Sequence, residues 1–283
     1  MIAILGGLGA AACWAAATVC SSRSSRMIGA ASVLAWVMLV GLVVSAPAVV
    51  FSGVPRGIDS RSVGWLSLAG TGNVVGLLLE YRALRIGKVG IVAPIASTEG
   101  AIAAVLAVIA GERVAPGTGM LLGVIAVGVV LAGLVPEADR GLTERHEGEA
   151  TLYAAGAALS FGVSLYAAGR VSQELPLVWV VLPARVVGVV ALTLPLALGS
   201  RLRLIGRAVP LVVTSGLCEV GGFVLFGVGA RHGIAITAVL GSQFAALSAL
   251  VAYAFFRERL AKLQVAGVAA ILVGVAILSG LQA

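Results

Sequence analysis

The sequence predicts an all-α membrane protein of ten transmembrane helices, arranged as two inverted five-helix repeats. Three observations predict it: the composition, the spacing of the apolar segments, and a similarity between the two halves of the chain. Hydrophobic residues make up 60% of the 283 residues and charged residues only 11%, whereas about a quarter of the residues are charged in ordinary soluble domains. A soluble fold of this length cannot bury so much apolar surface, so we expect the excess to face lipid.

Ten apolar segments approach the length of about 20 residues that a helix needs to cross a bilayer. Short charged or polar breaks separate them, and the longest polar stretch lies mid-chain at 136–149. We therefore predict a first five-helix unit over 1–135, a polar linker over 136–149 and a second five-helix unit over 150–283. The predicted spans are 2–20, 29–51, 63–81, 89–110, 117–135, 150–169, 176–199, 208–230, 234–256 and 263–281.

The two halves resemble each other when the chain is displaced on itself by about 146 residues. Glycines match in this register, and a displacement of one residue more aligns Trp14 with Phe161 and Gly41 with Gly188. The matched glycines are Gly70 with Gly216, Gly76 with Gly222 and Gly128 with Gly274. Five spans are an odd number, so a second unit of the same structure must enter the membrane from the opposite side. Such inverted repeats hold a binding site near the membrane midplane in secondary transporters.

Charge and motifs exclude several classes of function. The net charge is +7, but the basic side chains lie singly or in small groups in short loops. This pattern indicates membrane lipid headgroups and not nucleic acid as the partner. No cofactor is expected: the sequence lacks a G-x-x-x-x-G-K-[ST] loop for a nucleotide. Cys13, Cys20 and Cys218 form no C-x-x-C pair, so we expect neither a metal site nor a disulfide framework.

A motif recurs once in each half. The first copy is Ala83-Leu-Arg-Ile-Gly87 with Gly111-Glu-Arg-Val114, and the second is Ala230-Arg-His-Gly233 with Arg257-Glu-Arg-Leu260. This pair resembles the EamA-like domain of the drug/metabolite transporter superfamily over nearly the whole chain. Trp14 matches a tryptophan usual in the family's first helix, although Ala15 stands where glycine normally follows. The resemblance implies ten helices and the export or exchange of small metabolites without ATP hydrolysis.

Glu99 is the clearest candidate for a functional residue, because an ionisable group in the middle of a span is costly. It follows Ser97 and Thr98 in the fourth predicted span, so a carboxylate and two hydroxyls lie within one helical turn. Pro94 removes a backbone donor and leaves a carbonyl four residues earlier for a ligand or water. We expect substrate contact or proton coupling here. The alternative is a structural Glu99, protonated or paired with Arg185.

Glu219 lies in the middle of the eighth predicted span, and Asn73 is its counterpart in the third. Polar residues at the same depth of corresponding helices predict a central cavity; a hydrogen bond between helices is the alternative. Arg185, in the seventh span, stands where the first half has Met38. We expect Arg185 to counter Glu99 or Glu219 or to bind an anionic substrate, unless it reaches the lipid headgroups.

Four more residues are candidates for substrate binding. Ser242 and Gln243 in the ninth span correspond in position to the start of the Glu99 cluster, and we expect a hydrogen bond either to substrate or to a neighbouring helix. Trp14 and Tyr166 could stack on an organic solute, with helix packing as the alternative.

Three further glutamates are expected outside the substrate site. Glu80 ends the third predicted span and should lie at the membrane interface, whereas Glu112 and Glu258 lie at helix ends and suit local ion pairs or gating contacts.

The expected function is secondary transport of a small organic solute by alternating access, with protons as a candidate coupling ion. The expected location is a cell membrane, the bacterial plasma membrane. A membrane-embedded enzyme acting on a lipid-linked substrate and a non-transporting scaffold are the alternatives, but the acids are scattered singly. Thirteen Lys and Arg residues follow odd-numbered spans and five follow even-numbered ones, which favours both termini outside. The family's usual layout has both termini in the cytoplasm, so the orientation stays open.

Overall fold

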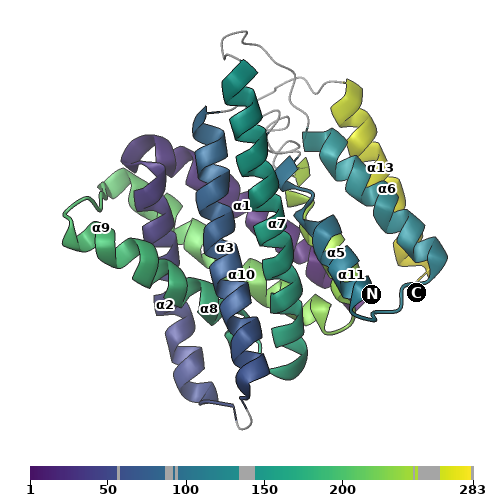
Figure 1. Cartoon of the computed structure of the whole chain (residues 1–283), viewed down its shortest axis with the longest axis horizontal. Coiled ribbons are helices and arrows are strands. Elements are labelled where there is room, and N and C mark those ends of the chain that lie inside the picture. The colour runs from purple at the N-terminus through teal and green to yellow at the C-terminus, as the bar shows by residue number, and fades with distance from the viewer. Residues whose placement is uncertain are drawn as a thin grey trace.

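The computed structural model describes residues 1–55, 58–86, 92, 95–133, 144–244, 246–247 and 262–281. Within these ranges every regular element is a helix (Figure 1). Six segments of the described part of the chain are long and apolar enough to cross a membrane. They are α1 (Ile2–Ile28), α2 (Ala30–Ser52), α3 (Ser60–Ile86), α7 (Glu144–Glu174), the continuous run from α8 (Val178–Gly188) through a π-helical turn (Val189–Thr193) to α9 (Leu194–Leu198), and α10 (Val209–Ala230) with the 3-10 turn before it (Gly206–Ala208).

Four further helices lie within the remaining predicted spans. They are α5 (Glu99–Ile109), α6 (Pro116–Gly133), α11 (Ile234–Gly241) and α13 (Lys262–Leu281). Parts of the fourth and ninth predicted spans lie outside the described residues, as does the segment 257–261 with Glu258.

Large apolar side chains cover the outside of the bundle. Phe51 is 89% exposed, Leu198 86% and Ile109 77%. Water would disfavour so much exposed apolar surface, whereas lipid does not. Together with the six long apolar helices, this exterior makes the chain a multi-pass membrane protein.

Helices of the first half pack mainly on helices of the second. The third helix of each half lies along the first helix of the other, as α3 on α7 and α10 on α1. The two last helices, α6 and α13, lie side by side (Figure 1). The buried core between these helices includes Leu165, Phe226 and Leu240.

Glycine brings the last helices into close contact. A Cβ added at Gly128 would lie 3.1 Å from Ile271 Cγ1, and one added at Gly274 would lie 2.6 Å from Ile125 Cγ1. Small residues allow such close approach of helices within lipid. Each glycine therefore faces an isoleucine of the other half in the same way.

The predicted boundaries differ from the observed ones at the linker. We predict a polar segment over 136–149, yet α7 already begins at Glu144. Residues 134–143 lie outside the described part of the chain.

Candidate functional site

A cavity of about 360 Å³ lies between helices of both halves. Four of the residues predicted to bind substrate line it: Trp14, Asn73, Glu99 and Glu219. The others in its wall are Ala17, Thr18, Ser21, Ser25, Ala30, Leu77, Glu80, Tyr81, Phe161, Ser164, Leu165, Phe223 and Phe244. It reaches the end of the bundle where α1 passes into α2, since Ser25 and Ala30 belong to its wall.

Three carboxylates share this cavity: Glu80, Glu99 and Glu219. Glu80, expected at the membrane interface, lies in the wall of this cavity in the last turns of α3. Glu99 is 6% exposed and lies in the first turn of α5, where the positive end of the helix dipole favours a carboxylate. None of the described lining residues is Lys or Arg. The wall is therefore strongly acidic.

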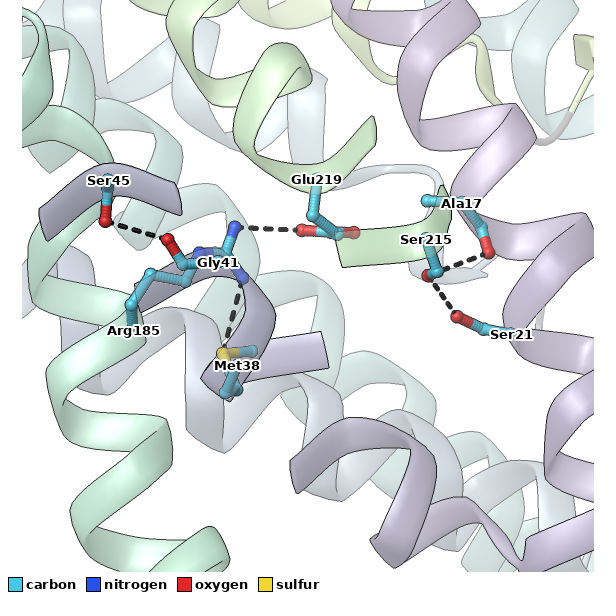
Figure 2. Close-up of polar contacts among 8 residues, drawn as sticks. All are labelled: Ala17, Ser21, Met38, Gly41, Ser45, Arg185, Ser215 and Glu219. Atoms are coloured by element: carbon cyan, nitrogen blue, oxygen red, sulfur yellow. Dashed lines mark hydrogen bonds and ion pairs between the residues drawn. The ribbon is translucent and has the colours of Figure 1, made fainter. Parts of the chain in front are cut away.

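Arg185 is completely buried behind this wall and pairs with Glu219. Its Nη2 donates to Glu219 Oε2 at 3.3 Å, and its Nη1 donates to Met38 Sδ at 3.3 Å. Figure 2 shows the guanidinium between these two groups. Its Cζ also lies 5.5 Å from the centre of the Phe223 ring, within the range of a cation–π contact. Of the expected partners, Arg185 pairs with Glu219 and not with Glu99.

Two glycines make room for this corner of the site. A Cβ at Gly41 would lie 2.7 Å from Arg185 Cδ, and a Cβ at Gly188 would lie 2.4 Å from Met38 Cγ. Gly41 and Gly188 correspond in the repeat register, as do Met38 and Arg185. The same contact is thus built twice, once around a methionine and once around an arginine.

Asn73 offers an unused polar atom at the cavity. Its side chain is 7% exposed, and its Oδ1 has no hydrogen-bond partner among the described residues. Buried polar groups normally have partners, because leaving one unpaired costs free energy. The carbonyl oxygen of Asn73 is therefore suited to accept a hydrogen bond from a bound molecule.

Aromatic rings enclose the same space. Trp14 meets Phe223 edge to face with centroids 5.4 Å apart, and also contacts Phe226 at 6.1 Å. A Cβ at Gly222 would lie 2.4 Å from Trp14 Nε1, and one at Gly76 would lie 2.5 Å from Phe161 Cδ1. Only glycine allows the backbone so close to either ring.

Hydroxyl groups tie the halves together beside the cavity. The Ser21 and Ser215 hydroxyls lie 2.6 Å apart, and Ser215 donates to the Ala17 carbonyl at 3.2 Å (Figure 2). Between α7 and α3, the corresponding pair of helices, Ser164 donates to the Ala69 carbonyl at 2.7 Å. Both contacts join the first helix of one half to the third helix of the other.

The polar residues of spans four and nine lie in interruptions of the helix. Ser97 and Thr98 form a turn before α5, and Ser242 and Gln243 form one after α11. Thr98 donates its hydroxyl to the Ile95 carbonyl at 2.7 Å, and Ser242 donates its own to the Val239 carbonyl at 3.0 Å. Pro94 lies outside the described residues.

These four polar residues lie beside the cavity and not in its wall. All except Thr98, which is partly buried, are at most 3% exposed, and Gln243 Nε2 has no partner in the described part of the chain. Ser242 also lies at a helix crossing, since a Cβ at Gly100 would be 2.5 Å from its Oγ. The polar pattern therefore marks helix breaks next to the site.

Tyr166 belongs to the other end of the bundle. Its ring meets Trp65 edge to face at 5.6 Å, and it lines a second cavity of about 500 Å³ with Glu112, Arg170 and Arg231. The sequence cannot place Tyr166, because depth in the membrane does not show which of two cavities a side chain lines.

Glu112 and Arg231 bind helix ends beside the second cavity. The Glu112 carboxylate accepts from the backbone N–H groups of Ile234 and Ala235 at 3.0 and 3.1 Å, at the start of α11. Arg231 donates to the carbonyls of Ser172 and Leu175 at 2.6 and 3.0 Å, at the end of α7. We call this the Glu112 end. Here Glu112 of the first half holds a helix of the second.

The repeat register contains the signal for the missed lining residues. Five pairs of corresponding positions line the first cavity: Trp14 with Phe161, Ala17 with Ser164, Thr18 with Leu165, Asn73 with Glu219 and Leu77 with Phe223. Phe161 is the repeat counterpart of Trp14, so the register itself indicates Phe161 as a lining residue. Phe223 could have been found from its place one turn beyond Glu219.

Among the described residues, no group of three or more His, Cys, Asp or Glu side chains is placed to hold a metal ion. A crystal structure that is 20% identical in sequence covers 99% of this chain and 96% of its own, with a TM-score of 0.79. That likeness shows a shared fold along essentially the whole length. No curated protein matches the sequence.

The model of the EamA-like transporter family matches residues 1–134. That stretch contains Trp14, Asn73 and Glu99 of the cavity wall. The resemblance stated from the sequence is thereby confirmed over residues 1–134, where this multi-pass membrane protein is similar to the EamA-like transporter family.

Proposed function

We propose that the chain is a secondary transporter, an exporter or exchanger of small organic metabolites or drugs in a cell membrane. It would work by alternating access and without ATP hydrolysis. The observation that carries the proposal is one cavity with corresponding residues of both halves in its wall, such as Asn73 and Glu219. Transporters built from inverted repeats place their substrate at this kind of junction.

The proposal includes ten helices in two inverted repeats, over 1–135 and 150–283 with a linker between. Reciprocal contacts support the duplication: Gly76 receives Phe161 of the second half, and Gly222 receives Trp14 of the first. Helix contacts are reciprocal too, since α5 packs on α7 as α11 packs on α1. A two-fold relation between the halves accounts for both sets of contacts.

The two ends of the bundle suggest how access would alternate. The first cavity reaches the end of the bundle where α1 passes into α2, which we call the Ser25 end. At the opposite Glu112 end, the carboxylate of Glu112 bonds to the start of α11. Opening the Glu112 end would require these bonds to break while the Ser25 end closes. The interrupted helices at Ser97 and Ser242 offer places for such a movement, because broken helices accompany substrate sites in transporters.

Glu99 and Glu219 are the proposed groups for substrate contact or proton coupling. Both line the cavity, and a carboxyl group can release its proton when a solute or an ion binds. Trp14 and Asn73 would contact the solute directly. Ser97, Thr98, Ser242 and Gln243 would act through the helix breaks, and Tyr166 at the other end of the path.

An untargeted comparison of solutes released by cells tests this function. Cells producing the wild-type chain should release at least one solute that cells producing Glu99→Gln retain. Glu149→Gln is the matched control, because Glu149 is exposed at the start of α7. Identical profiles for wild type, Glu99→Gln and cells lacking the protein, at equal amounts in the membrane, would refute the proposal.

A further inference from the structure

We propose that the transported solute is an organic cation, a protonated amine on an apolar body. This inference rests on the proposed function and adds the chemical class of the substrate. The first cavity contains the carboxylates, the unpaired Asn73 oxygen and the aromatic rings that such a molecule needs.

The charge balance of the cavity is the first argument. Glu219 has Arg185 as its counterion at 3.3 Å. Within the described residues, Glu80 and Glu99 take part in no ion pair or side-chain hydrogen bond, and no lining residue is cationic. The ionised form of a buried carboxyl group is costly without a partner. A bound cation would neutralise one of these carboxylates, whereas a bound anion would add to the repulsion.

Asn73 gives the second argument, independent of the acids. Its Oδ1 is buried and unpaired, and it lies in the same wall. An amide oxygen accepts hydrogen bonds and does not donate them. An ammonium group carries only donors, so it can satisfy Asn73 and a glutamate together. A carboxylate solute cannot satisfy this oxygen.

The aromatic wall is the third argument. Trp14, Tyr81, Phe161, Phe223 and Phe244 border the cavity. The faces of aromatic rings attract cations, and the attraction grows when water is excluded. Phe223 already faces the Arg185 guanidinium at 5.5 Å, so a ring of this wall accepts a cation in the structure itself. The remaining apolar surface suits the body of the solute.

Three solutes of nearly equal shape separate charge from size: phenethylamine, phenethyl alcohol and phenylacetate. The full chain, purified in detergent, is titrated with each at neutral pH by calorimetry. We expect phenethylamine to bind at least tenfold more tightly than the alcohol, and phenylacetate to show no binding. Glu99→Gln should weaken amine binding at least tenfold, and Asn73→Leu should weaken it severalfold. The exposed control Glu149→Gln should bind like wild type.

Equal affinity for amine and alcohol, a preference for phenylacetate, or no binding of the amine would each overturn the cation proposal. Flux of the same solutes into liposomes containing the protein tests the transport function separately. Binding of the amine without any flux would leave the cation site standing and contradict the transporter. Flux of only the neutral or the anionic solute would leave the transporter standing and contradict the cation site.

Discussion

The two halves of the chain share their packing but differ in charge. Gly41 and Gly188 receive Arg185 and Met38 in the same way, and Gly76 and Gly222 receive aromatic rings in the same way. The polar groups do not follow this duplication: Arg185 stands opposite Met38 in the register, and Glu219 stands opposite Asn73. Packing is therefore shared by the two halves, whereas the polar groups at the proposed site differ between them.

The largest expected effect comes from removing the charge partner of Arg185. Glu219→Gln leaves the guanidinium buried without its counterion, because Arg185 is 0% exposed. Breaking a buried pair in this way costs about 3–5 kcal/mol. Thermal unfolding in detergent should show a clearly lower midpoint, whereas Glu149→Gln should leave it unchanged.

A double variant turns this result into a test of the comparison between the halves. Arg185→Met with Glu219→Asn gives the second half the residues of the first at both positions. Removing both charges should restore most of the stability lost in Glu219→Gln, because no uncompensated charge remains. Transport should be lost in the double variant. If the double variant is no more stable than the single one, the ion pair is not what Arg185 contributes.

The next effect concerns the duplicated packing itself. Gly76→Ala and Gly222→Ala each bring a Cβ to within about 2.5 Å of an aromatic ring, and overpacking of this kind costs about 1–3 kcal/mol. We expect similar losses in thermal stability for the two variants. Gly64→Ala is the matched control, since nothing lies within 4 Å of its Cβ. Loss at only one of the two sites would contradict the reciprocal packing.

Asn73→Leu should change stability in the opposite direction. The Asn73 carbonyl oxygen is buried and unpaired, and an apolar residue of similar size removes that cost of about 1 kcal/mol or more. A higher unfolding midpoint combined with weaker solute binding is the expected outcome. A variant that is less stable than wild type would show that Asn73 supports the fold.

The smallest effect is at the start of α3, where the two halves also differ. Asp59 accepts from the Ser62 N–H and hydroxyl, both at 2.8 Å, whereas α10 begins without a side-chain cap. The hydrogen bonds from Ser62 lower the pKa of Asp59 below its usual value. The carboxylate therefore stabilises the fold above the unfolded pKa of about 3.9, and this contribution is lost as the pH falls through the lower folded value.

Thermal unfolding of Asp59→Asn and wild type should consequently differ slightly at pH 7 and converge toward pH 3. A difference that grows as the pH falls would mean that Asp59 is not ionised in the folded protein.

Sequence patterns predict the helical membrane fold because lipid demands long apolar helices, and they predict Glu99 and Glu219 because charges in a span are rare. They fail where depth alone is ambiguous. Tyr166 is predicted to contact the solute together with Trp14 but lines the second cavity and not the first. The direction in which a helix face points depends on how the halves pack, and periodicity shows little of it in helices that are apolar all round.

The central claim is that the two halves open alternately, and the Glu112 end tests it most directly. Spin labels at Arg113 and His232, both exposed and on different halves, report the separation of that end in lipid. We predict two distance populations, the longer one appearing when the bonds between Glu112 and α11 are weakened by Glu112→Gln or when a transported solute is added. A single distance that neither change alters would contradict alternating access.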